Sequence, residues 1–469
     1  MRESTSKLSF DPGSFKDPEG RVFYHDGRVF RTLSADARAR IVRVGSDGTL
    51  TELIDRGLMI DAGLVDTESL GLDRSILGET VLRQRRLPMI SYPHEWSFEM
   101  LRDGALVTLD LLEACLAKDL ILKDATAFNV TADSGRMVFF DVLSIDDYTD
   151  SHPWDGYAQF CREFLFPLML TSYKGVEFQP WFRGTLQGLP VRQFARLMSL
   201  RDRLRPGVLK HAVLQAGLER SFSESDVEVR SSFKSVKFAK GMILANISGL
   251  RKLIRGLPYE VGDSVWGAYA ATHSYNTADY AQKRDFVAGA IGRLAPSTVV
   301  DLGGNIGDYS LLVAPQVERV VCVDIDPACI NTLYKRVRAD AIANVVPIVG
   351  DLLNPSPWLG WALNERRDLF SRIRSDAFLA LALVHHICIG GNVPIDSFAK
   401  QLADIAPEGV VEWVDKDDAM VQRLLRNRSD VFADYSWDSF RAALEAHFTI
   451  AETRDSHEGR RRLCLLRAR

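Results

Sequence analysis

One stretch of the chain, residues 297–314, constrains the fold more than any other. It reads Ser-Thr-Val-Val-Asp-Leu-Gly-Gly-Asn-Ile-Gly-Asp-Tyr-Ser-Leu-Leu-Val-Ala, which predicts a buried strand over 298–302, a glycine turn and then a helix. A strand that ends in glycines and leads into a helix lets the backbone approach a ligand closely. The glycine spacing differs from the GxGxxG pattern of dinucleotide-binding proteins. The stretch therefore predicts a ligand site of a different kind at the end of this strand.

Residues 261–469 alternate predicted strands and helices, which indicates a doubly wound, largely parallel sheet. A helix over 279–294 leads into the first strand. In such sheets a ligand lies beyond the carboxyl ends of the strands, so the strand ends are where a site is expected. The later strands are expected at 319–324, 345–351, 376–384, 409–414, 447–453 and 461–466.

An aspartate stands at or near the end of each of the first three predicted strands of this sheet: Asp301, Asp324 and Asp351. A carboxylate in the position of Asp324 is suited to accept two hydrogen bonds from a ribose diol. A carboxylate in the position of Asp351 is suited to accept one from an adenine amino group. The three residues together predict a ligand that contains adenosine.

The spacing Asp301-x-Gly303-x-Asn305-x-Gly307 resembles the first motif of class I S-adenosylmethionine (SAM) methyltransferases. The resemblance implies that SAM is the cofactor and that Asp301 lies near its sulfonium and amino-acid end. A fold that uses NAD is the alternative, and the glycine spacing disfavours it. The predicted cofactor-binding residues are Asp301, Gly303, Gly304, Asn305, Gly307, Asp324, Ile325, Asp351, Leu352 and Tyr269.

The catalytic candidates stand at the ends of the fourth and fifth predicted strands: His385, His386 and Asp415. Methyl transfer is an in-line displacement, so a base is needed only when the acceptor starts protonated. Either histidine has a side chain suited to that role. The alternative is that one imidazole caps the next segment or borders the adenosine. A group of aromatic residues before the first strand either covers the ligands or packs in the core: Trp266, Tyr269, His273, Tyr275 and Tyr280.

The N-terminal half carries a different acidic pattern, formed by Asp124, Asn129 and Asp141. Their spacing resembles the catalytic loop and the metal-binding strand of protein kinases and aminoglycoside-type phosphotransferases. In those enzymes the first aspartate accepts the substrate proton, and the other two residues hold magnesium. We expect no other metal site in the chain.

The N-terminal half also departs from active kinases. No glycine-rich phosphate loop precedes the pattern, and the only lysines before Lys118 are Lys7 and Lys16 in the N-terminal tail. Because phosphoryl transfer depends on positioned charges, we expect a degenerate, pseudokinase-like domain that holds a substrate or a partner. An active kinase is the alternative.

Residues 240–257 predict a basic amphipathic helix, with Met242, Leu244, Ile247, Leu250 and Ile254 facing inward. Such a helix either packs between domains or lies on a membrane, and the first is the common case. The predicted parts of the chain are a small mixed α/β lobe (1–90), a kinase-like helical lobe (91–220), a linker with the amphipathic helix (221–260) and the methyltransferase domain (261–469).

The bulk composition fits a cytoplasmic globular protein. The chain has 469 residues with 46% apolar residues and a net charge of −4, which gives no reason to expect a nucleic-acid partner. Six scattered cysteines without a CxxC pair indicate buried thiols. No signal peptide and no membrane span is expected.

The whole chain resembles a bacterial family of class I SAM-dependent methyltransferases, some of them nodulation-protein-like. The resemblance rests on Ser91-Tyr-Pro-His-Glu-Trp-Ser-Phe98, Leu122-Lys-Asp-Ala-Thr-Ala-Phe-Asn129 and Phe378-Leu-Ala-Leu-Ala-Leu-Val-His-His386. We therefore expect an α/β chain with a C-terminal Rossmann-like class I methyltransferase domain of seven strands and an N-terminal degenerate protein-kinase-like α+β domain. The implied activity is methyl transfer to a small-molecule or a carrier- or peptide-borne acceptor. A bifunctional kinase–methyltransferase and a non-catalytic SAM-binding scaffold are the alternatives.

Overall fold

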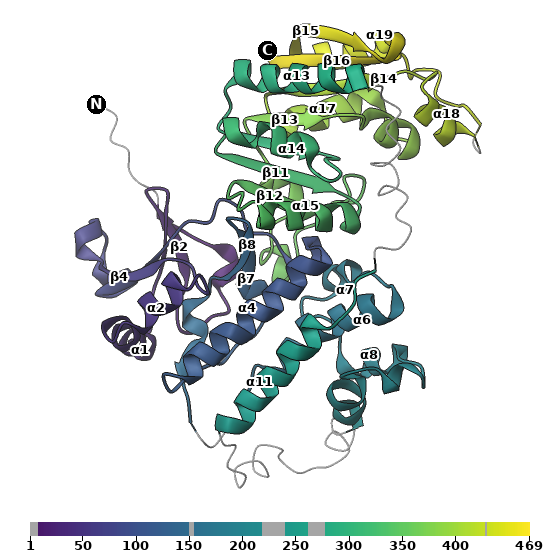
Figure 1. The fold of residues 1–469 in the computed structure, drawn as a ribbon. Helices are drawn as coiled ribbons and strands as arrows, with labels where there is room; N and C mark the ends of the chain where they lie inside the picture. The colour runs from purple at the N-terminus through teal and green to yellow at the C-terminus, as the bar shows by residue number, and fades with distance from the viewer. Residues whose placement is uncertain (1–7, 150–153, 218–239, 261–276, 427–428) are drawn as a thin grey trace. The chain divides into compact units, whose positions relative to one another are not determined.

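The computed structural model describes residues 8–149, 154–217, 240–260, 277–426 and 429–469 (Figure 1). These residues form a mixed α/β structure, which confirms the predicted class. The described residues divide into two compact units. Unit 1 is drawn from Met1–His94, Met100–Glu260 and Trp358–Arg366, and unit 2 from Glu95–Glu99, Val261–Pro357 and Arg367–Arg469.

Unit 1 contains a five-stranded antiparallel sheet in the order β1-β2-β3-β5-β4. The sequence pattern predicts a hairpin around His25-Asp-Gly27, and β2 and β3 form it. Asp26 and Gly27 both adopt positive φ, at 48° and 72°, as a tight hairpin turn requires. Phe23 and Phe30 from these two strands are fully buried. The strands are β1 (Ser9–Phe10), β2 (Val22–His25), β3 (Arg28–Arg31), β4 (Ala62–Asp66) and β5 (Thr80–Gln84).

The rest of unit 1 is mainly helical, with two short two-stranded sheets. The sequence pattern also predicts a strand over 88–92 and a helix over 98–116. The helix is confirmed as α4 (Phe98–Leu116), whereas residues 88–92 form no strand. The other helices are α1 (Ala35–Ser46), α2 (Thr49–Asp55), α3 (Arg74–Leu77), α5 (Tyr157–Phe160), α6 (Phe166–Lys174), α7 (Gln179–Gly184), α8 (Val191–Leu197) and α11 (Lys240–Arg255). The short sheets pair β6 (Leu120–Leu122) with β9 (Ile145–Asp147) and β7 (Val130–Asp133) with β8 (Arg136–Phe139).

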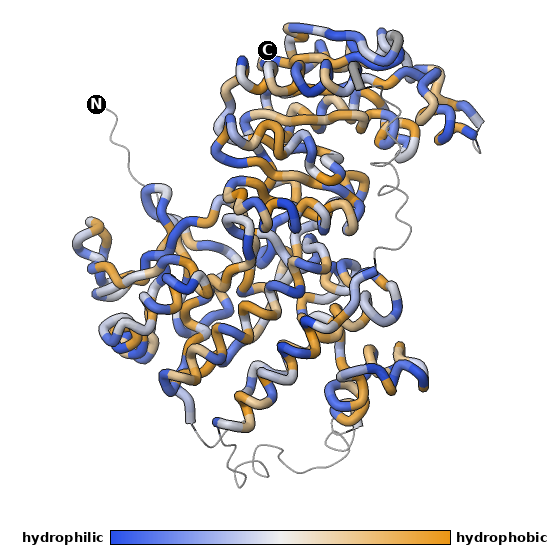
Figure 2. The backbone as a smooth tube through the Cα atoms, in the orientation of Figure 1, coloured by the Kyte–Doolittle hydropathy of each residue, from blue (hydrophilic) through white to orange (hydrophobic). Residues whose placement is uncertain are grey.

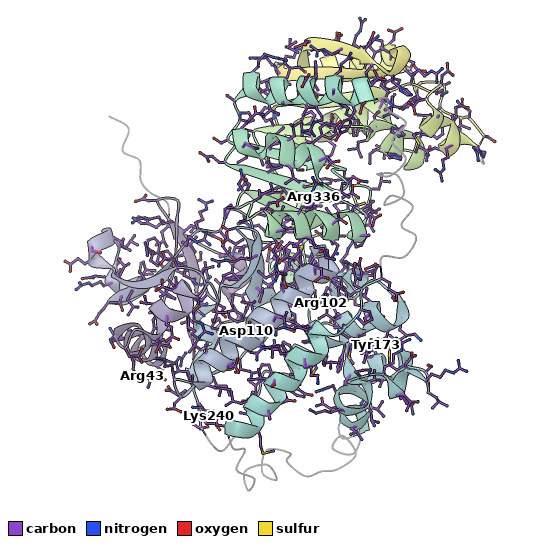
Figure 3. All side chains as sticks on the ribbon, viewed as in Figure 1. Arg43, Arg102, Asp110, Tyr173, Lys240 and Arg336 are labelled. Atoms are coloured by element: carbon purple, nitrogen blue, oxygen red, sulfur yellow. The ribbon has the colours of Figure 1, made fainter. Side chains whose placement is uncertain are left out.

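Helix α11 buries one apolar face within unit 1, through Ile243, Ile247, Leu250 and Ile254. The expectation for Met242 was wrong, since its side chain is 58% exposed. Basic residues of α11 form ion pairs with acidic residues of unit 1, as Arg251 does with Asp110 of α4 at 2.8 Å; Figure 3 labels Asp110 and, at the start of α11, Lys240. The helix therefore packs within unit 1, whereas packing between domains was expected.

Unit 2 contains a seven-stranded sheet in the order β12-β11-β10-β13-β14-β16-β15. The first five strands in this order are parallel, and β16 is antiparallel to both of its neighbours. The central strands are apolar and buried along nearly their whole length, as parallel strands covered on both faces are (Figure 2). The strands are β10 (Thr298–Leu302), β11 (Arg319–Asp324), β12 (Val345–Val349), β13 (Ala377–Ala380), β14 (Glu408–Val414), β15 (Phe448–Ser456) and β16 (Arg461–Ala468).

Helices connect the parallel strands of unit 2, and α13, α14 and α15 follow one another along one face of its sheet (Figure 1). The helices are α13 (Thr277–Leu294), α14 (Asp308–Val313), α15 (Pro327–Ala339), α16 (Leu369–Arg372), α17 (Ile395–Ile405), α18 (Ala419–Leu425) and α19 (Trp437–Glu445). The strand predicted over 376–384 ends early, at Ala380. Ala382 has a φ of +50°, which turns the chain out of the sheet and carries the two histidines into a short π-helical turn, His386–Gly390.

All six cysteines are buried and free, which confirms the prediction of buried thiols. Among the described residues, no helix combines the length and the apolar character that crossing a membrane requires.

Candidate functional site

The turn after β10 relies on left-handed backbone. Gly303 and Gly307 have φ values of +73° and +78°, which a residue with a Cβ adopts only at a cost. The backbone N–H of Gly303 donates to the carbonyl oxygen of Val323 at 2.8 Å and so fixes the turn against β11. A Cβ on Gly304 would collide with the sulfur of Cys322 and lie 2.9 Å from a carboxylate oxygen of Asp301. The glycines therefore hold the backbone close to the strand end.

Asp324 ends β11, next to this turn. Its carboxylate accepts the backbone N–H of Asn305 at 2.8 Å and that of Asp326 at 2.9 Å, one on each oxygen. Burial raises the pKa of Asp324 to about 6, although the backbone hydrogen bonds oppose the shift. A carboxylate offers about four acceptor positions, so that of Asp324 can still accept two hydroxyl groups of a ligand.

Asp301 lies on β10 and Asp351 follows β12, the two strands that flank β11. The carboxylate of Asp301 accepts the hydroxyl of Ser310 at 2.7 Å, and that of Asp351 accepts the backbone N–H of Leu353 at 2.9 Å. Burial, with a further contribution from the charge of Asp324, raises the pKa of Asp301 to about 6. Three carboxylates thus stand at the ends of three adjacent strands, as predicted from the sequence.

A cavity of about 380 Å³ lies at these strand ends. Its volume falls within the range of about 300–1,000 Å³ that is usual for small-molecule sites. Gly307 is not among the lining residues and instead precedes the first residue of α14; Tyr269 lies outside the described residues. The predicted cofactor-binding residues that do line the cavity are Asp301, Gly303, Gly304, Asn305, Asp324, Ile325, Asp351 and Leu352.

The three catalytic candidates differ in their relation to the cavity. His386 lines it, whereas His385 and Asp415 are not among the lining residues. His385 is fully buried, and neither of its ring nitrogens has a hydrogen-bond partner among the described residues. Burial lowers the pKa of His386 to about 4, so its imidazole is neutral at pH 7. Of the three, His386 is placed to face a ligand.

Lys283 is a cavity residue that the sequence analysis missed. Its side chain is 4% exposed, and its ammonium group lies 2.6 Å from a carboxylate oxygen of Glu412 and 5.0 Å from the ring centre of Tyr309. One feature of the sequence could have indicated that Lys283 is buried. Lys283 stands three and four residues before Phe286 and Val287, on the buried face of α13, where a lysine is unexpected. Of the aromatic residues expected either to cover the ligands or to pack in the core, Tyr280 lines the cavity. The others lie outside the described residues: Trp266, Tyr269, His273 and Tyr275.

The acidic residues of unit 1 form a closed arrangement. The carboxylate of Asp141 accepts hydrogen bonds from the amide of Asn129 at 3.3 Å and the hydroxyl of Ser144 at 2.9 Å. The guanidinium of Arg31, on β3, forms ion pairs with Asp141 and with Asp17 and is 7% exposed.

Asp124 is half-buried, and burial together with the charge of Asp141 raises its pKa. Across the described residues, no group of three His, Cys, Asp or Glu side chains is arranged to hold a metal ion.

Solved structures give partial likenesses to the chain. The N-methyltransferase NodS from Bradyrhizobium japonicum WM9, in complex with S-adenosyl-L-homocysteine (SAH), is 13% identical, and the match covers 44% of this chain and 93% of that one with a TM-score of 0.30. The magnesium protoporphyrin IX methyltransferase ChlM from Synechocystis PCC 6803, with bound SAH, is 17% identical over 43% and 92% of the two chains, with a TM-score of 0.31.

No protein-family model matches the chain. A curated protein does, along nearly its whole length: the nodulation protein NoeA of Rhizobium meliloti (strain 1021) is 35% identical over 435 residues, which cover 92% of this chain and 90% of that protein. This match confirms the nodulation-protein-like part of the resemblance seen in the sequence. The chain belongs to the family of the nodulation protein NoeA.

Proposed function

We propose that the chain is a SAM-dependent methyltransferase of the class I fold and that the cavity of unit 2 holds the cofactor. The observation that carries the proposal is the placement of Asp301, Asp324 and Asp351 at three adjacent strand ends, all lining one cavity beside a glycine turn. In open parallel sheets this edge is where ligands bind.

The chemistry of the lining residues fits the three parts of SAM. The carboxylate of Asp324 accepts the ribose hydroxyls, and that of Asp351 accepts the adenine amino group. Asp301 lies on the side of the amino-acid end, where its negative charge attracts the ammonium and the sulfonium. Ile325 and Leu352, which also line the cavity, offer apolar contacts to the adenine ring.

Bound SAM supplies a methyl group on a positively charged sulfur. The role of the chain is to orient the acceptor in line with that methyl group and to exclude water from it. His386 lines the cavity as a neutral imidazole and can accept a hydrogen bond from the acceptor. A pKa of about 4 makes it a weak base at pH 7, so we propose that it mainly orients an acceptor that is nucleophilic without losing a proton first.

We propose further that unit 1 is a degenerate kinase-like domain that holds the acceptor or a partner. The kinase-like interpretation of Asp124, Asn129 and Asp141 is supported by the five-stranded sheet that precedes these residues in the chain. In protein kinases a lysine on the third strand contacts the nucleotide phosphates and an aspartate holds magnesium. Here the third strand carries Arg31, which is paired with Asp141 itself. This pairing favours a domain without phosphoryl-transfer activity. The acceptor that we propose is a small molecule or a carrier- or peptide-borne group, in the cytoplasm.

Calorimetric titration with SAH tests the cofactor proposal. Replacing Asp324 with alanine removes a charged acceptor of two hydrogen bonds, so the Asp324→Ala variant should bind SAH at least about 100-fold more weakly. Asp376→Ala is the matched control. Asp376 accepts the backbone N–H of Thr298 at 2.8 Å at the opposite, amino end of the strands, and its loss should leave the affinity unchanged.

Wild-type protein that does not bind SAH, or an Asp324→Ala variant that is folded and binds as tightly as wild type, would contradict the proposal. Tight SAH binding without transfer of a labelled methyl group from SAM to any component of a cell extract would favour the alternative of a non-catalytic scaffold.

A further inference from the structure

The cavity of unit 2 contains a buried cation that the proposed roles so far leave unused. We propose that Lys283 forms a carboxylate-binding subsite and receives the carboxylate of the amino-acid end of the cofactor. This inference rests on the proposed function, because it assumes that SAM occupies the cavity.

The charges of the cavity carry the argument. The amino-acid end of SAM holds an ammonium and a carboxylate, so its site needs an anion and a cation. Asp301 supplies the anion. Among the described residues that line the cavity, Lys283 is the only lysine or arginine. A ligand carboxylate that is removed from water requires such a partner, because an uncompensated buried charge is costly.

Glu412 has the role of a positioning residue for Lys283. It is fully buried on β14, and its carboxylate oxygen lies 2.6 Å from the Lys283 ammonium. Burial lowers the pKa of Lys283, and the charge of Glu412 opposes that shift. Glu412 therefore favours the charged form of the lysine in the cavity. An ammonium group has three hydrogen-bond donors, so the bond to Glu412 does not by itself exhaust the donors of Lys283.

The buried pair also stands within a larger set of charges. Arg461 of β16 lies 4.0 Å from Glu412 and forms an ion pair with Asp418 at 2.8 Å. Lys283, Arg461, Glu412 and Asp418 thus form a buried set of two cations and two carboxylates. A purely structural role, in which Lys283 only joins α13 to β14, is the competing explanation that the experiment has to exclude.

Two ligands separate these explanations. SAH contains the amino-acid end, and 5′-methylthioadenosine has the same adenosine and thioether but lacks it. In the Lys283→Met variant, calorimetry should show SAH binding weakened by about 10- to 100-fold, the range for a hydrogen bond to a charged group, with 5′-methylthioadenosine unchanged. Arg284→Met is the matched control, since Arg284 is the next residue on α13, lies over the ring of Tyr280 and does not line the cavity.

The outcomes are distinguishable from a failure of the proposed function. If wild-type protein binds neither ligand, the cofactor proposal fails. If it binds both, and Lys283→Met weakens both equally or weakens neither, the carboxylate subsite alone is overturned. Should Lys283→Met fold poorly because Glu412 is left unpaired, the double variant Lys283→Met/Glu412→Gln removes both charges, and the same loss selective for SAH is expected.

Glu412→Gln tests the positioning role through a pH profile. The groups that face Lys283 are Glu412, Arg461, Asp301, His385 and Tyr309. Lys283 has to be protonated to bind a carboxylate, so SAH binding is lost as pH rises through its pKa. Without the charge of Glu412 that loss should occur at a lower pH than in wild type, and binding of 5′-methylthioadenosine should show no such change. An unchanged SAH profile would overturn the role of Glu412.

Discussion

Each of the two units brings carboxylates together, but the hydrogen-bond donors to those carboxylates differ. In unit 2, Asp301, Asp324 and Asp351 accept hydrogen bonds only from backbone N–H groups and a serine hydroxyl in the described structure, and they line a cavity. In unit 1, Asp141 and Asp17 are both paired with the guanidinium of Arg31. The donors to the three aspartates of unit 2 are all neutral, whereas in unit 1 a cation is added to the neutral donors of Asp141.

The kind of donor decides whether a buried carboxylate is available to bind a ligand. A carboxylate that is held by neutral donors keeps its negative charge available, and its burial raises its pKa, as in Asp301 and Asp324. A carboxylate that is paired with a buried arginine is already neutralised, and removing the arginine would leave an uncompensated charge. The acidic residues of unit 2 are therefore suited to bind a ligand, and those of unit 1 to stabilise the unit itself.

The largest expected effect that sharpens this comparison comes from Arg31→Met. The substitution leaves two carboxylates without their cation, so the unfolding free energy of unit 1 should fall by about 3–5 kcal/mol. Scanning calorimetry measures this loss of unfolding free energy. SAH should shift only the unfolding transition of unit 2, so the transition that it leaves unchanged is assigned to unit 1. Arg38→Met is the control, because Arg38 and its partner Glu79 are exposed and their loss should cost at most about 1 kcal/mol.

Two further measurements, on Arg31→Met and on the wild-type protein, could contradict this contrast between the units. SAH affinity should stay at the wild-type value, since the cofactor cavity is lined by residues of unit 2. Magnesium should leave the melting temperature of wild-type unit 1 unchanged, because Arg31 already neutralises Asp141. A clear rise with magnesium would favour the kinase–methyltransferase alternative.

The sequence alone predicted the centre of unit 2 well and the sheet of unit 1 poorly. The bounds of β10 and β11 agree with the structure because both are continuous apolar runs that end at glycine or aspartate. After residue 55 the sequence pattern indicates acidic loops, but the strands β4 and β5 form there. β4 contains a glycine and an acidic residue and is only half-buried at the edge of its sheet, so it lacks a clear alternation.

The candidate site shows the same limit. The three aspartates were found because each one follows a recognisable strand. Lys283 was missed because its significance depends on Glu412, which is 129 residues away in the sequence and meets it only in the folded unit. Arg31 was missed for the same reason, since its partner Asp141 is 110 residues away.

The smallest expected effect is a pH dependence of ligand binding in unit 2. In the proposed site, Asp301 and Asp324 bind the ligand as ionised carboxylates. Each has a pKa of about 6, so affinity should be full above neutral pH and fall as pH drops through 6. Between pH 7.5 and 5.5 one such group loses about fourfold of its ionised form, and two lose about sixteenfold. His386 has a pKa of about 4 and stays neutral across this range, so it does not contribute.

The two ligands assign that pH dependence to individual residues. SAH contacts both carboxylates in the proposed site, so its affinity should fall by about sixteenfold. 5′-Methylthioadenosine lacks the amino-acid end and depends on Asp324 alone, so its affinity should fall by about fourfold. An equal fall for both ligands would mean that Asp301 does not contact the amino-acid end. No fall for either would mean that these buried carboxylates do not bind the ligand as anions, and the contrast between the two units would then lose its basis.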